Sequence, residues 1–361
     1  MSFLAKNLRM NGSPITTKLP NMHGVPFGTI FSPHQVHIDW TKKGGWQDPQ
    51  LIDFGNLSIP IQAGSLHYGL QCFEGLKAYY APGDKTIRLF RPEMNAARMN
   101  RSMARLAFPT FDEKEWVQVL KELVKTDKDF VPREEGYTLY LRPGAIATNA
   151  NLHVGPTDSV KLFMIASPVG PYYPDGFKPV KLVVDSKHKR AWPGGSGDCK
   201  IGPNYGPTIM HQVEHAKKGF PQVLWLGAKG EINEVGAMNF MVLWKNKNGD
   251  RELITPALDG TILPGVTRDS ILKLTAAWNE FKVTEGVFTI DELMAALKEG
   301  RVEEVFGCGT AAIVTAVNGL HMDGQDFAIP IPEKSTAQRI LNELSDIQYG
   351  RKESPWSVVV C

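Results

Sequence analysis

Lys200 lies in a stretch of the chain, residues 192–206, whose composition constrains the fold more than that of any other segment. Five of its residues are glycines, and Tyr205 follows Lys200 by five positions. Glycines allow tight turns and the close approach of a bulky group, which a solvated helix surface does not need. A lysine crowded in this way loses its proton more readily and can attack a carbonyl carbon to form a Schiff base. One lysine among 40 basic residues is ordinarily an exposed charge, so it is the surroundings of Lys200 that predict a nucleophile.

The length of 361 residues predicts two domains, because hydrophobic cores seldom grow beyond roughly 250–300 residues before a chain divides. Residues 168–176 are dense in proline and glycine, which is typical of a linker. We therefore expect a small N-terminal domain over residues 1–170, a linker over 171–178 and a large domain over 179–361.

Composition argues against several classes of partner. A net charge of +2 gives no electrostatic footprint for a nucleic acid or an anionic membrane. The longest mostly apolar stretch, residues 306–317, is too short to span a bilayer and contains glycine and threonine. Four cysteines lie far apart without a Cys-x-x-Cys pair, which indicates reduced thiols in an intracellular protein and no metal site. We expect a cytoplasmic protein; because residues 1–14 contain Lys6 and Arg9 but no acid, a short mitochondrial targeting segment is the alternative.

Periodicity predicts a strand-rich chain with added helices. Residues 1–50 show little periodicity and predict an extended arm. Thr110 and Glu113 match a capping box, which predicts a helix after Thr110. The apolar face of that helix consists of Trp116, Val119, Leu120, Leu123 and Val124. Strands are predicted over residues 136–142, 161–169, 180–185, 222–226, 239–244 and 252–255.

Turn and cap signals complete the predicted elements. The pair Asn248-Gly249 between the last two strands predicts a β-hairpin. Helices are predicted over residues 267–281 and after Thr289, which forms a second capping-box pattern with Glu292. Strands dominate both halves without a regular strand–helix alternation, so the predicted class is α+β with mixed sheets and flanking helices.

Two familiar motifs fail on inspection. Residues 194–198 miss the nucleophile-elbow pattern, because Asp198 stands where that pattern has its last glycine. Residues 307–312 match Gly-x-Gly-x-x-Ala, but a dinucleotide-binding fold requires a helix to follow. Residues 313–317 are rich in β-branched side chains and favour a strand, so we reject the dinucleotide hypothesis.

Other residues have both a functional and a plainer interpretation. Glu234 lies in a mostly apolar strand-like run; it is either an outward-facing strand residue or a buried carboxylate that holds a proton on a pyridine nitrogen. Residues 263–268 open a helix, where free N–H groups favour a phosphate, and Thr267 adds a hydroxyl. A plain Pro-Gly turn is the alternative there. Arg98 would add a positive charge, although such an arginine is more often on a helix surface.

Taken together, these segments resemble the branched-chain amino acid aminotransferases among the fold type IV pyridoxal phosphate (PLP) enzymes. The resemblance runs from about residue 27 to residue 350. It depends on the order and spacing of residues 66–75, 89–92, 139–143, 192–206, 233–236, 262–265 and 304–311. It implies a two-domain fold like that of D-amino acid aminotransferase. It also implies reversible transamination of L-leucine, L-isoleucine and L-valine with 2-oxoglutarate.

Position by position, the resemblance implies that Lys200 binds PLP covalently and moves the α-proton. Glu234 would pair with the pyridine nitrogen, and Tyr205 with the phenolate oxygen. The other residues placed at the cofactor are Arg98, Arg190, Ala237, Leu263, Gly265, Val266, Thr267 and Thr310. Those placed at the substrate are Phe27, Tyr68, Phe73, Tyr140, Arg142, Tyr172 and Ala311. Tyr68 would come from the partner subunit, which implies a homodimer.

The residue types at the substrate agree with this interpretation. Aromatic and small side chains suit branched aliphatic substrates. Tyr140 and Arg142 are two apart on a predicted strand, so both point to one face, where the arginine would neutralise the side-chain carboxylate of glutamate. D-amino acid transamination, aminodeoxychorismate lyase chemistry and a non-catalytic binding protein with the same fold are the alternatives.

Two positions depart from the family's pattern. Some animal members carry a redox-sensing Cys-x-x-Cys pair where this chain has Ala312 and Thr315, so thiol control by that route is not expected. Ala237 stands where some relatives have a threonine near the cofactor, which puts the relative substrate preference in doubt.

Overall fold

The computed structural model describes residues 2–171 and 178–361, which form two compact units. The first unit takes in the described residues up to 171 together with Cys199–Gly202 and Ser345–Cys361. The second unit takes in the described residues from 178 to Asp198 and Pro203–Leu344. The sequence predicts a single large domain over 179–361; in the structure two segments of that range cluster with the first unit instead. Residues 172–177 of the predicted linker lie outside the described residues.

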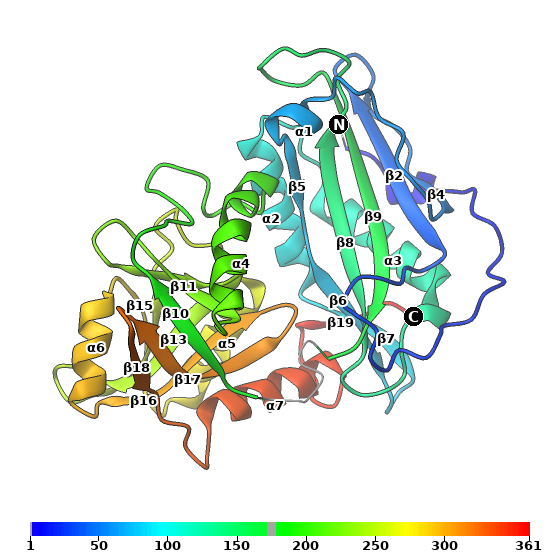
Figure 1. Ribbon diagram of the computed structural model, residues 1–361. Helices are drawn as coiled ribbons and strands as arrows, with labels where there is room; N and C mark the ends of the chain where they lie inside the picture. Colours follow the sequence, from blue (N-terminus) through cyan, green and yellow to red (C-terminus); the bar gives the residue numbers. More distant parts are fainter. Residues whose placement is uncertain (1, 172–177) are drawn as a thin grey trace. The chain divides into compact units, whose positions relative to one another are not determined.

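A mostly antiparallel sheet forms the first unit, with ten strands among its described residues (Figure 1). Its main path is β1-β4-β2-β9-β8-β6-β7-β19, with β3 paired to β2 and β5 to β8. The strands are β1 (Arg9–Met10), β2 (His34–Thr41), β3 (Gly45–Trp46), β4 (Gln50–Asp53), β5 (Gln71–Phe73), β6 (Leu76–Ala81), β7 (Thr86–Phe90), β8 (Thr138–Ala147), β9 (Ser159–Val169) and β19 (Ser357–Val359).

The long strands β8 and β9 confirm two of the predicted strands. They pair without a register shift from Thr138 opposite Val169 to Ala147 opposite Val160. The predicted extended arm over residues 1–50 is wrong in part, because residues 34–41 form β2 and pair with β9. Val36 and Ile38 are fully buried there and alternate with polar residues, which is a strand pattern. The pattern is short, and the rest of residues 1–50 shows little periodicity, so this strand was not predicted from the sequence.

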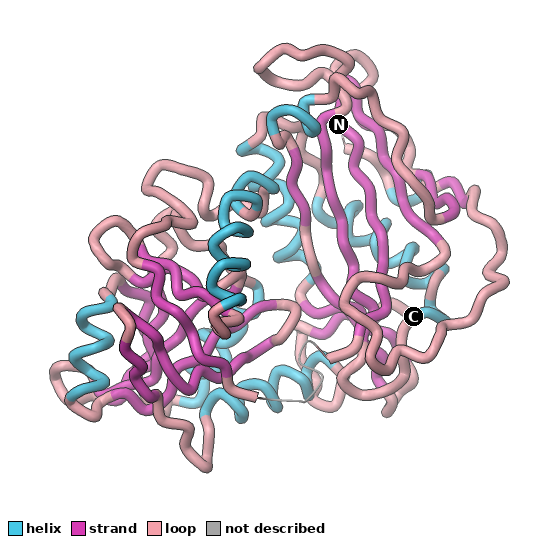
Figure 2. The backbone as a smooth tube through the Cα atoms, viewed as in Figure 1, coloured by secondary structure: helices cyan, strands magenta, loops and turns pink. Residues whose placement is uncertain are grey.

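Helices cover one face of this sheet and enclose the first core (Figure 2). They are α2 (Pro92–Arg105) and α3 (Glu113–Thr126), with short 3-10 turns at Ala5–Asn7 and Lys128–Phe130. The short helix α1 (Gly64–Tyr68) contributes no residue to this core. The five apolar residues predicted on one face of α3 are all buried. They pack into the same cluster as Met99 and Met103 of α2 and Val36 of β2, so helices and sheet share one core.

The start of α3 differs from its predicted capping box. The helix begins at Glu113, and Asp112 is its N-cap residue, with Oδ1 accepting hydrogen bonds from the backbone N–H groups of Lys114 and Glu115. The carboxylate of Asp112 thus serves two of the four unpaired N–H groups of the first turn. Thr110 lies outside the helix.

Side-chain burial explains why residues 199–202 fold with the first unit. Cys199 and Ile201 are 2% and 4% exposed and belong to the first core. Ile201 forms an antiparallel bridge with Cys72 of β5. Because successive side chains of an extended chain alternate in direction, Lys200 between them points away from that core. The C-terminal segment joins the same unit because β19 pairs with β7.

A mixed sheet forms the second unit, with nine strands among its described residues in the order β12-β11-β10-β17-β16-β13-β14-β15. β18 pairs with β17, and β12 also pairs with β13. The strands are β10 (Val180–Asp185), β11 (Gln222–Leu226), β12 (Ile232–Val235), β13 (Met238–Lys245), β14 (Arg251–Pro256), β15 (Lys282–Gly286), β16 (Val302–Gly309), β17 (Ile313–Met322) and β18 (Gln325–Ala328). The helices are α4 (Ile209–Lys217), α5 (Val266–Trp278), α6 (Ile290–Lys298) and α7 (Thr336–Gln348), of which the last four residues belong to the first unit. Two 3-10 turns, Gly202–Asn204 and Gly206–Thr208, precede α4.

Several predicted elements of this unit are confirmed. β13 and β14 pair antiparallel around the Asn248-Gly249 turn, where Gly249 has a φ of 87°. The capping box of α6 is present, with Thr289 accepting from the Glu292 backbone and Glu292 accepting from the Thr289 backbone. Residues after Ala312 continue as strand β17, not as a helix. Both units combine mixed or antiparallel sheets with flanking helices, which confirms the α+β class.

Among the described residues, no helix combines the length and apolar character that crossing a membrane requires.

The cap of α3 gives a test of the fold. Asp112→Ala should lower the free energy of unfolding by about 1 kcal/mol, because two N–H groups at the helix start lose their acceptor. Thr110→Ala is the matched control, since this exposed residue lies outside the helix, and its effect should stay below about 0.5 kcal/mol. Equilibrium urea unfolding followed by circular dichroism measures both. An equal or larger loss for Thr110→Ala would show that the capping box predicted from the sequence operates in solution.

Candidate active site

The backbone of Lys200 is fixed to the first unit on both sides. Its N–H donates to Ser102 Oγ on α2 at 2.8 Å, and its carbonyl accepts from the Phe73 N–H at the end of β5 at 3.0 Å. Gly202 allows the same approach, because a Cβ there would lie 2.8 Å from Gln71 Nε2. A Cβ at Gly197 would lie 2.5 Å from the backbone carbonyl oxygen of Thr261, so this glycine allows the close approach of chain to chain that the composition of the stretch predicts.

The amine of Lys200 lies over the ring of Phe73, with Nζ 4.7 Å from the ring centroid. Burial lowers the pKa of Lys200 to about 8, and the positive charge of Arg98 acts in the same direction, while Glu74 opposes it. With this pKa about one-tenth of the amine is neutral at pH 7, against roughly one part in 2,500 for an ordinary lysine. This environment favours the neutral form of the amine, the form that a Schiff-base nucleophile requires.

Arg98 is not the surface arginine of the plainer interpretation. It lies on α2, is 6% exposed and forms a two-point ion pair with Glu74. Arg98 Nε donates to Oε1 at 2.7 Å and Nη2 donates to Oε2 at 2.8 Å. Asn95, one turn earlier on the same helix, donates to Oε2 at 2.8 Å. The sequence-based site omits Glu74 and Asn95. Glu74 could have been found from its position beside Phe73 within residues 66–75, a segment of the family resemblance.

Aromatic side chains and one arginine form the predicted substrate group of the first unit. Arg142 Nη2 donates to the hydroxyl of Tyr140 at 3.0 Å, so the two residues share one face of β8 as predicted. Phe27 meets Tyr140 edge to face at 5.0 Å, and the Arg142 guanidinium lies 4.8 Å from the centroid of Phe73. A Cβ at Gly75 would lie 2.0 Å from the Tyr140 hydroxyl, so glycine is required there.

Two further residues were predicted at the substrate, Tyr68 and Tyr172. Tyr68 ends α1, is 38% exposed, and donates from its hydroxyl to the Leu152 carbonyl at 2.6 Å. Tyr172 lies outside the described residues.

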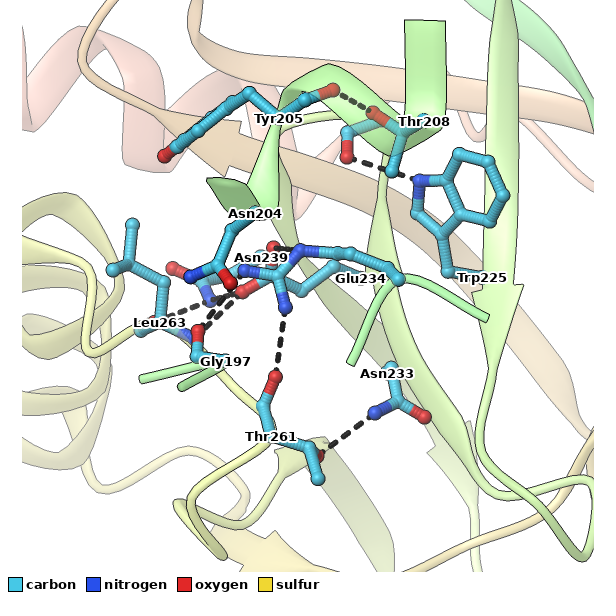
Figure 3. A network of polar contacts seen from close by, with 12 residues as sticks. Gly197, Asn204, Tyr205, Thr208, Trp225, Asn233, Glu234, Asn239, Thr261 and Leu263 are labelled. Atoms are coloured by element: carbon cyan, nitrogen blue, oxygen red, sulfur yellow. Dashed lines mark hydrogen bonds and ion pairs between the residues drawn. The ribbon is translucent and has the colours of Figure 1, made fainter. Parts of the chain in front are cut away.

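In the second unit, Glu234 is the centre of a buried polar network (Figure 3). The residue is 2% exposed and lies on β12, as the strand-like run predicts. Its Oε1 accepts from the Leu263 N–H at 2.7 Å and from Asn239 Nδ2 at 3.4 Å. The plainer interpretation of Glu234 as an outward-facing strand residue is therefore wrong.

Arg190 completes the network as the cationic partner of Glu234. Its Nε lies 2.9 Å from Glu234 Oε2. Its two terminal nitrogens donate to the Thr261 carbonyl at 2.8 Å and the Gly197 carbonyl at 3.1 Å. Every nitrogen of the guanidinium thus has an acceptor, and the carboxylate of Glu234 is held in one orientation.

The start of α5 joins this network through Asn239, which the sequence did not single out. Asn239 lies opposite Glu234 across the β12–β13 hairpin and donates to the Leu263 carbonyl at 2.8 Å. A Cβ at Gly265 would lie 2.1 Å from Asn239 Oδ1, so only glycine fits as N-cap residue. The helix then begins at Val266 without a side-chain cap, which leaves the N–H groups of Val266 and Thr267 to bind a ligand.

The remaining predicted residues lie in turns of the second unit. Thr310 and Ala311 lie between β16 and β17, and Ala237 lies in the turn between β12 and β13. Ile313 follows with a φ of 61°, a strained value for a β-branched residue, so pairing of β16 with β17 holds this turn in place. Tyr205 is half-buried, and its carbonyl accepts from Thr208 Oγ1 at 2.8 Å.

The residues that the structure describes contain no group of three or more His, Cys, Asp or Glu side chains suited to a metal ion.

Solved structures share this fold. A branched-chain aminotransferase from Thermoproteus uzoniensis with norvaline has a TM-score of 0.73 and 23% identity, covering 90% of this chain and 99% of its own. The PLP form of a branched-chain amino acid aminotransferase from Thermobaculum terrenum has a TM-score of 0.73 and 20% identity, covering 92% and 99%. At these identities the likeness shows the architecture alone.

Sequence comparison goes further. The family model described as amino-transferase class IV matches residues 71–320. A branched-chain-amino-acid aminotransferase of Dictyostelium discoideum is 52% identical over 339 residues, 92% of this chain and 89% of the relative. The cytosolic one of Mus musculus is 45% identical over 361 residues, 99% and 93% of the two chains. The mitochondrial one of Schizosaccharomyces pombe is 45% identical over 350 residues, 94% and 82%. The chain belongs to the class IV aminotransferase family.

The lowered pKa of Lys200 gives a direct test. In protein freed of carbonyl adducts with hydroxylamine, the rate of Lys200 acetylation should rise with pH and level off just above pH 8, where the amine becomes neutral. The exposed residue Lys43 serves as internal control. Peptide mass spectrometry after brief treatment with acetic anhydride measures each site. A Lys200 rate that still climbs steeply above pH 9.5 would show an ordinary, solvated amine.

Proposed function

We propose that this protein transfers the amino group of L-leucine, L-isoleucine and L-valine to 2-oxoglutarate, using PLP linked to Lys200. The observation that carries the proposal is the Lys200 amine, with its pKa near 8, in a class IV aminotransferase chain. Relatives up to 52% identical over nearly the whole chain are named for branched-chain substrates. The substrate preference of this chain is inferred from them and from its own aromatic residues.

The residues present fit PLP, group by group. Lys200 supplies the neutral amine that a Schiff base needs, and Arg98 supplies a cation for the phosphate. In the second unit the buried carboxylate of Glu234 fits a protonated ring nitrogen, and Tyr205 offers a hydroxyl to the phenolate oxygen. The uncapped first turn of α5 offers N–H groups to a phosphate. The remaining proposed cofactor ligands are Arg190, Ala237, Leu263, Gly265, Val266, Thr267 and Thr310.

Each residue has a defined task in this proposal. Bound PLP supplies an electron-accepting ring that stabilises negative charge on the α-carbon of the amino acid. Lys200 Nζ takes up the α-proton and later returns it, which requires a neutral amine and hence a low pKa. Glu234 holds the proton on the ring nitrogen, and Arg190 orients the carboxylate.

The proposed substrate residues account for a dual specificity. Phe27, Phe73 and Tyr140 present aromatic surface to a branched aliphatic side chain. Arg142, fixed by its hydrogen bond to Tyr140, offers a positive charge to the side-chain carboxylate of glutamate or 2-oxoglutarate. We assign substrate contacts also to Tyr172 and Ala311, and to Tyr68 of a second subunit.

Absorption spectroscopy tests the proposal. Purified protein with PLP should show a visible band that disappears on addition of L-leucine alone and returns with 2-oxoglutarate, because each half-reaction shifts the amino group once. Lys200→Ala should abolish this cycle, with overall transamination falling by at least about a thousandfold. Lys43→Ala, on the surface, is the matched control and should keep the wild-type cycle.

Two outcomes would contradict the assignment in different ways. A band that responds to D-alanine but not to L-leucine would support PLP as the cofactor and refute the branched-chain L-amino acids as substrates. Absence of any band after incubation with PLP would favour a binding protein that has kept the fold without the reaction.

We propose a homodimer that covers an exposed apolar patch around Tyr68. The Tyr68 patch consists of Ile61, Leu66, Tyr68, Leu152 and Val154, which are 76%, 54%, 38%, 60% and 73% exposed. Hydrogen bonds from Tyr68 to the Leu152 carbonyl and between His67 and the Ile61 carbonyl hold its segments together. Such a cluster is typical of a subunit interface.

Sedimentation tests the dimer. Wild-type protein should sediment at twice the 40.0 kDa of one chain, and the double variant Leu152→Asp/Val154→Asp should dissociate at least about tenfold more readily, because two carboxylates would enter the interface. Val287→Asp is the control, since this residue is 69% exposed in the second unit. A monomeric wild type, or a double variant as tightly paired as the control, would refute the proposal.

The proposed compartment is the cytoplasm, with the mitochondrion as the alternative. Relatives named for each compartment match the chain, and unpaired cysteines suit both reducing environments.

A further inference from the structure

Glu74 is the most completely enclosed acidic side chain near Lys200. It follows β5, and its side chain is 0% exposed. Oε1 accepts from Arg98 Nε, and Oε2 accepts from Arg98 Nη2, Asn95 Nδ2 and the Gly75 N–H at 2.7, 2.8, 2.8 and 3.1 Å. Both oxygens are therefore engaged by fixed donors, and the carboxylate has no freedom to turn.

This pair fixes the plane of the Arg98 guanidinium. A carboxylate on the Nε and Nη2 edge sets both the rotation and the tilt of the group, because two parallel hydrogen bonds define a plane. Asn95 is three residues before Arg98 on α2, so both side chains approach Glu74 from one face of the helix. The Nη1 edge of the guanidinium is then directed away from Glu74.

Packing alone does not account for the pair. A buried ion pair can often be replaced by apolar residues of similar size with little loss of stability, because desolvation offsets the attraction. Burial opposes the charged form of Glu74, yet Arg98 and the other partners hold its pKa below the ordinary value. The carboxylate therefore stays charged inside the first unit, at a position where its fixed partner is a proposed phosphate ligand.

We propose that Glu74 is a positioning residue for cofactor binding, which holds Arg98 in the one orientation that presents its other edge to the phosphate of PLP. The inference rests on the proposed function, since it assumes that PLP is the cofactor. Glu74 itself touches neither phosphate nor substrate. Replacement of Glu74 should therefore weaken the part of the cofactor affinity that comes from the phosphate, and leave the affinity for the rest of the cofactor unchanged.

The same carboxylate affects the charge around Lys200. The groups that act on the Lys200 amine are Arg98 from α2, Glu74, and Tyr140 and Arg142 from β8. Arg98 and Arg142 lower its pKa, whereas Glu74 and Tyr140 raise it. Glu74 thus partly offsets the effect of the Arg98 guanidinium, so the Lys200 amine can still take up a proton.

Comparison of PLP with pyridoxal, which lacks the phosphate, isolates the proposed role. The dissociation constant of each is measured by absorbance titration of cofactor-free wild type, Glu74→Gln and Glu93→Gln. Glu93 is the matched control, because it undergoes the same change on an exposed part of α2. In Glu74→Gln one carboxylate oxygen is replaced by an NH₂ group, which cannot accept a hydrogen bond from the guanidinium, so one of the two parallel hydrogen bonds is lost. The preference for PLP over pyridoxal should then fall by about ten- to a hundredfold. Glu93→Gln should keep it.

The possible failures can be told apart. If wild type shows no preference for PLP over pyridoxal, the proposed cofactor itself fails. If wild type shows the preference and Glu74→Gln retains it in full, only the role of Glu74 is refuted. An equal loss of affinity for both compounds in Glu74→Gln would also refute it, because that result indicates a general structural fault.

A second variant covers the case in which Glu74→Gln does not fold, and a second measurement applies where it does. Asn95→Ala removes one hydrogen bond to Glu74 without a change of charge, and it should reduce the same preference by about threefold. Retention of the full preference in Asn95→Ala would count against the proposal. In folded Glu74→Gln, the pH at which Lys200 acetylation levels off should move below that of wild type, and an upward shift would contradict the charge relation described above.

Discussion

The site depends on the way the chain anchors Lys200 by its backbone. A hydrogen bond from the Phe73 N–H and another to Ser102 Oγ fix the lysine on both sides. Its neighbours Cys199 and Ile201 are buried in the first core. These contacts leave only the side chain of Lys200 to project from the anchored segment. The amine then lies near Phe73, Arg98 and Glu74. Its burial and the two neighbouring charges set its pKa.

Among the described residues, a buried glutamate–arginine pair lies in each unit, and the proposed ligand is the arginine in one pair and the glutamate in the other. In the first unit Glu74 orients Arg98, so the proposed ligand is the cation. In the second unit Arg190 and two amide groups orient Glu234, so the proposed ligand is the anion. A buried charge that must bind a ligand has to stay ionised and immobile, and an opposite charge with fixed hydrogen bonds achieves both.

Local patterns were sufficient to predict much of the fold. The predicted strands 180–185 and 222–226, the Asn248-Gly249 hairpin and the Thr289 capping box are present as expected, because each depends on neighbouring residues. The extended arm was wrong at β2, whose partner β9 lies far along the chain. Glu74 and Asn239 were missed for the same reason. Their importance comes from contacts with Arg98 and Gly265, which only the folded chain brings near.

The path of the chain between the two units limits how this protein can be divided. The boundary is crossed at four points, and Lys200 lies in a four-residue segment, Cys199–Gly202, that belongs to the first unit although both of its flanks belong to the second. The last strand, β19, likewise returns to the first sheet. A cut near residue 175 would therefore separate the first sheet from both its edge strand and Lys200. A fragment that ends near this cut would lack part of the first unit, so the chain cannot be divided there into two complete units.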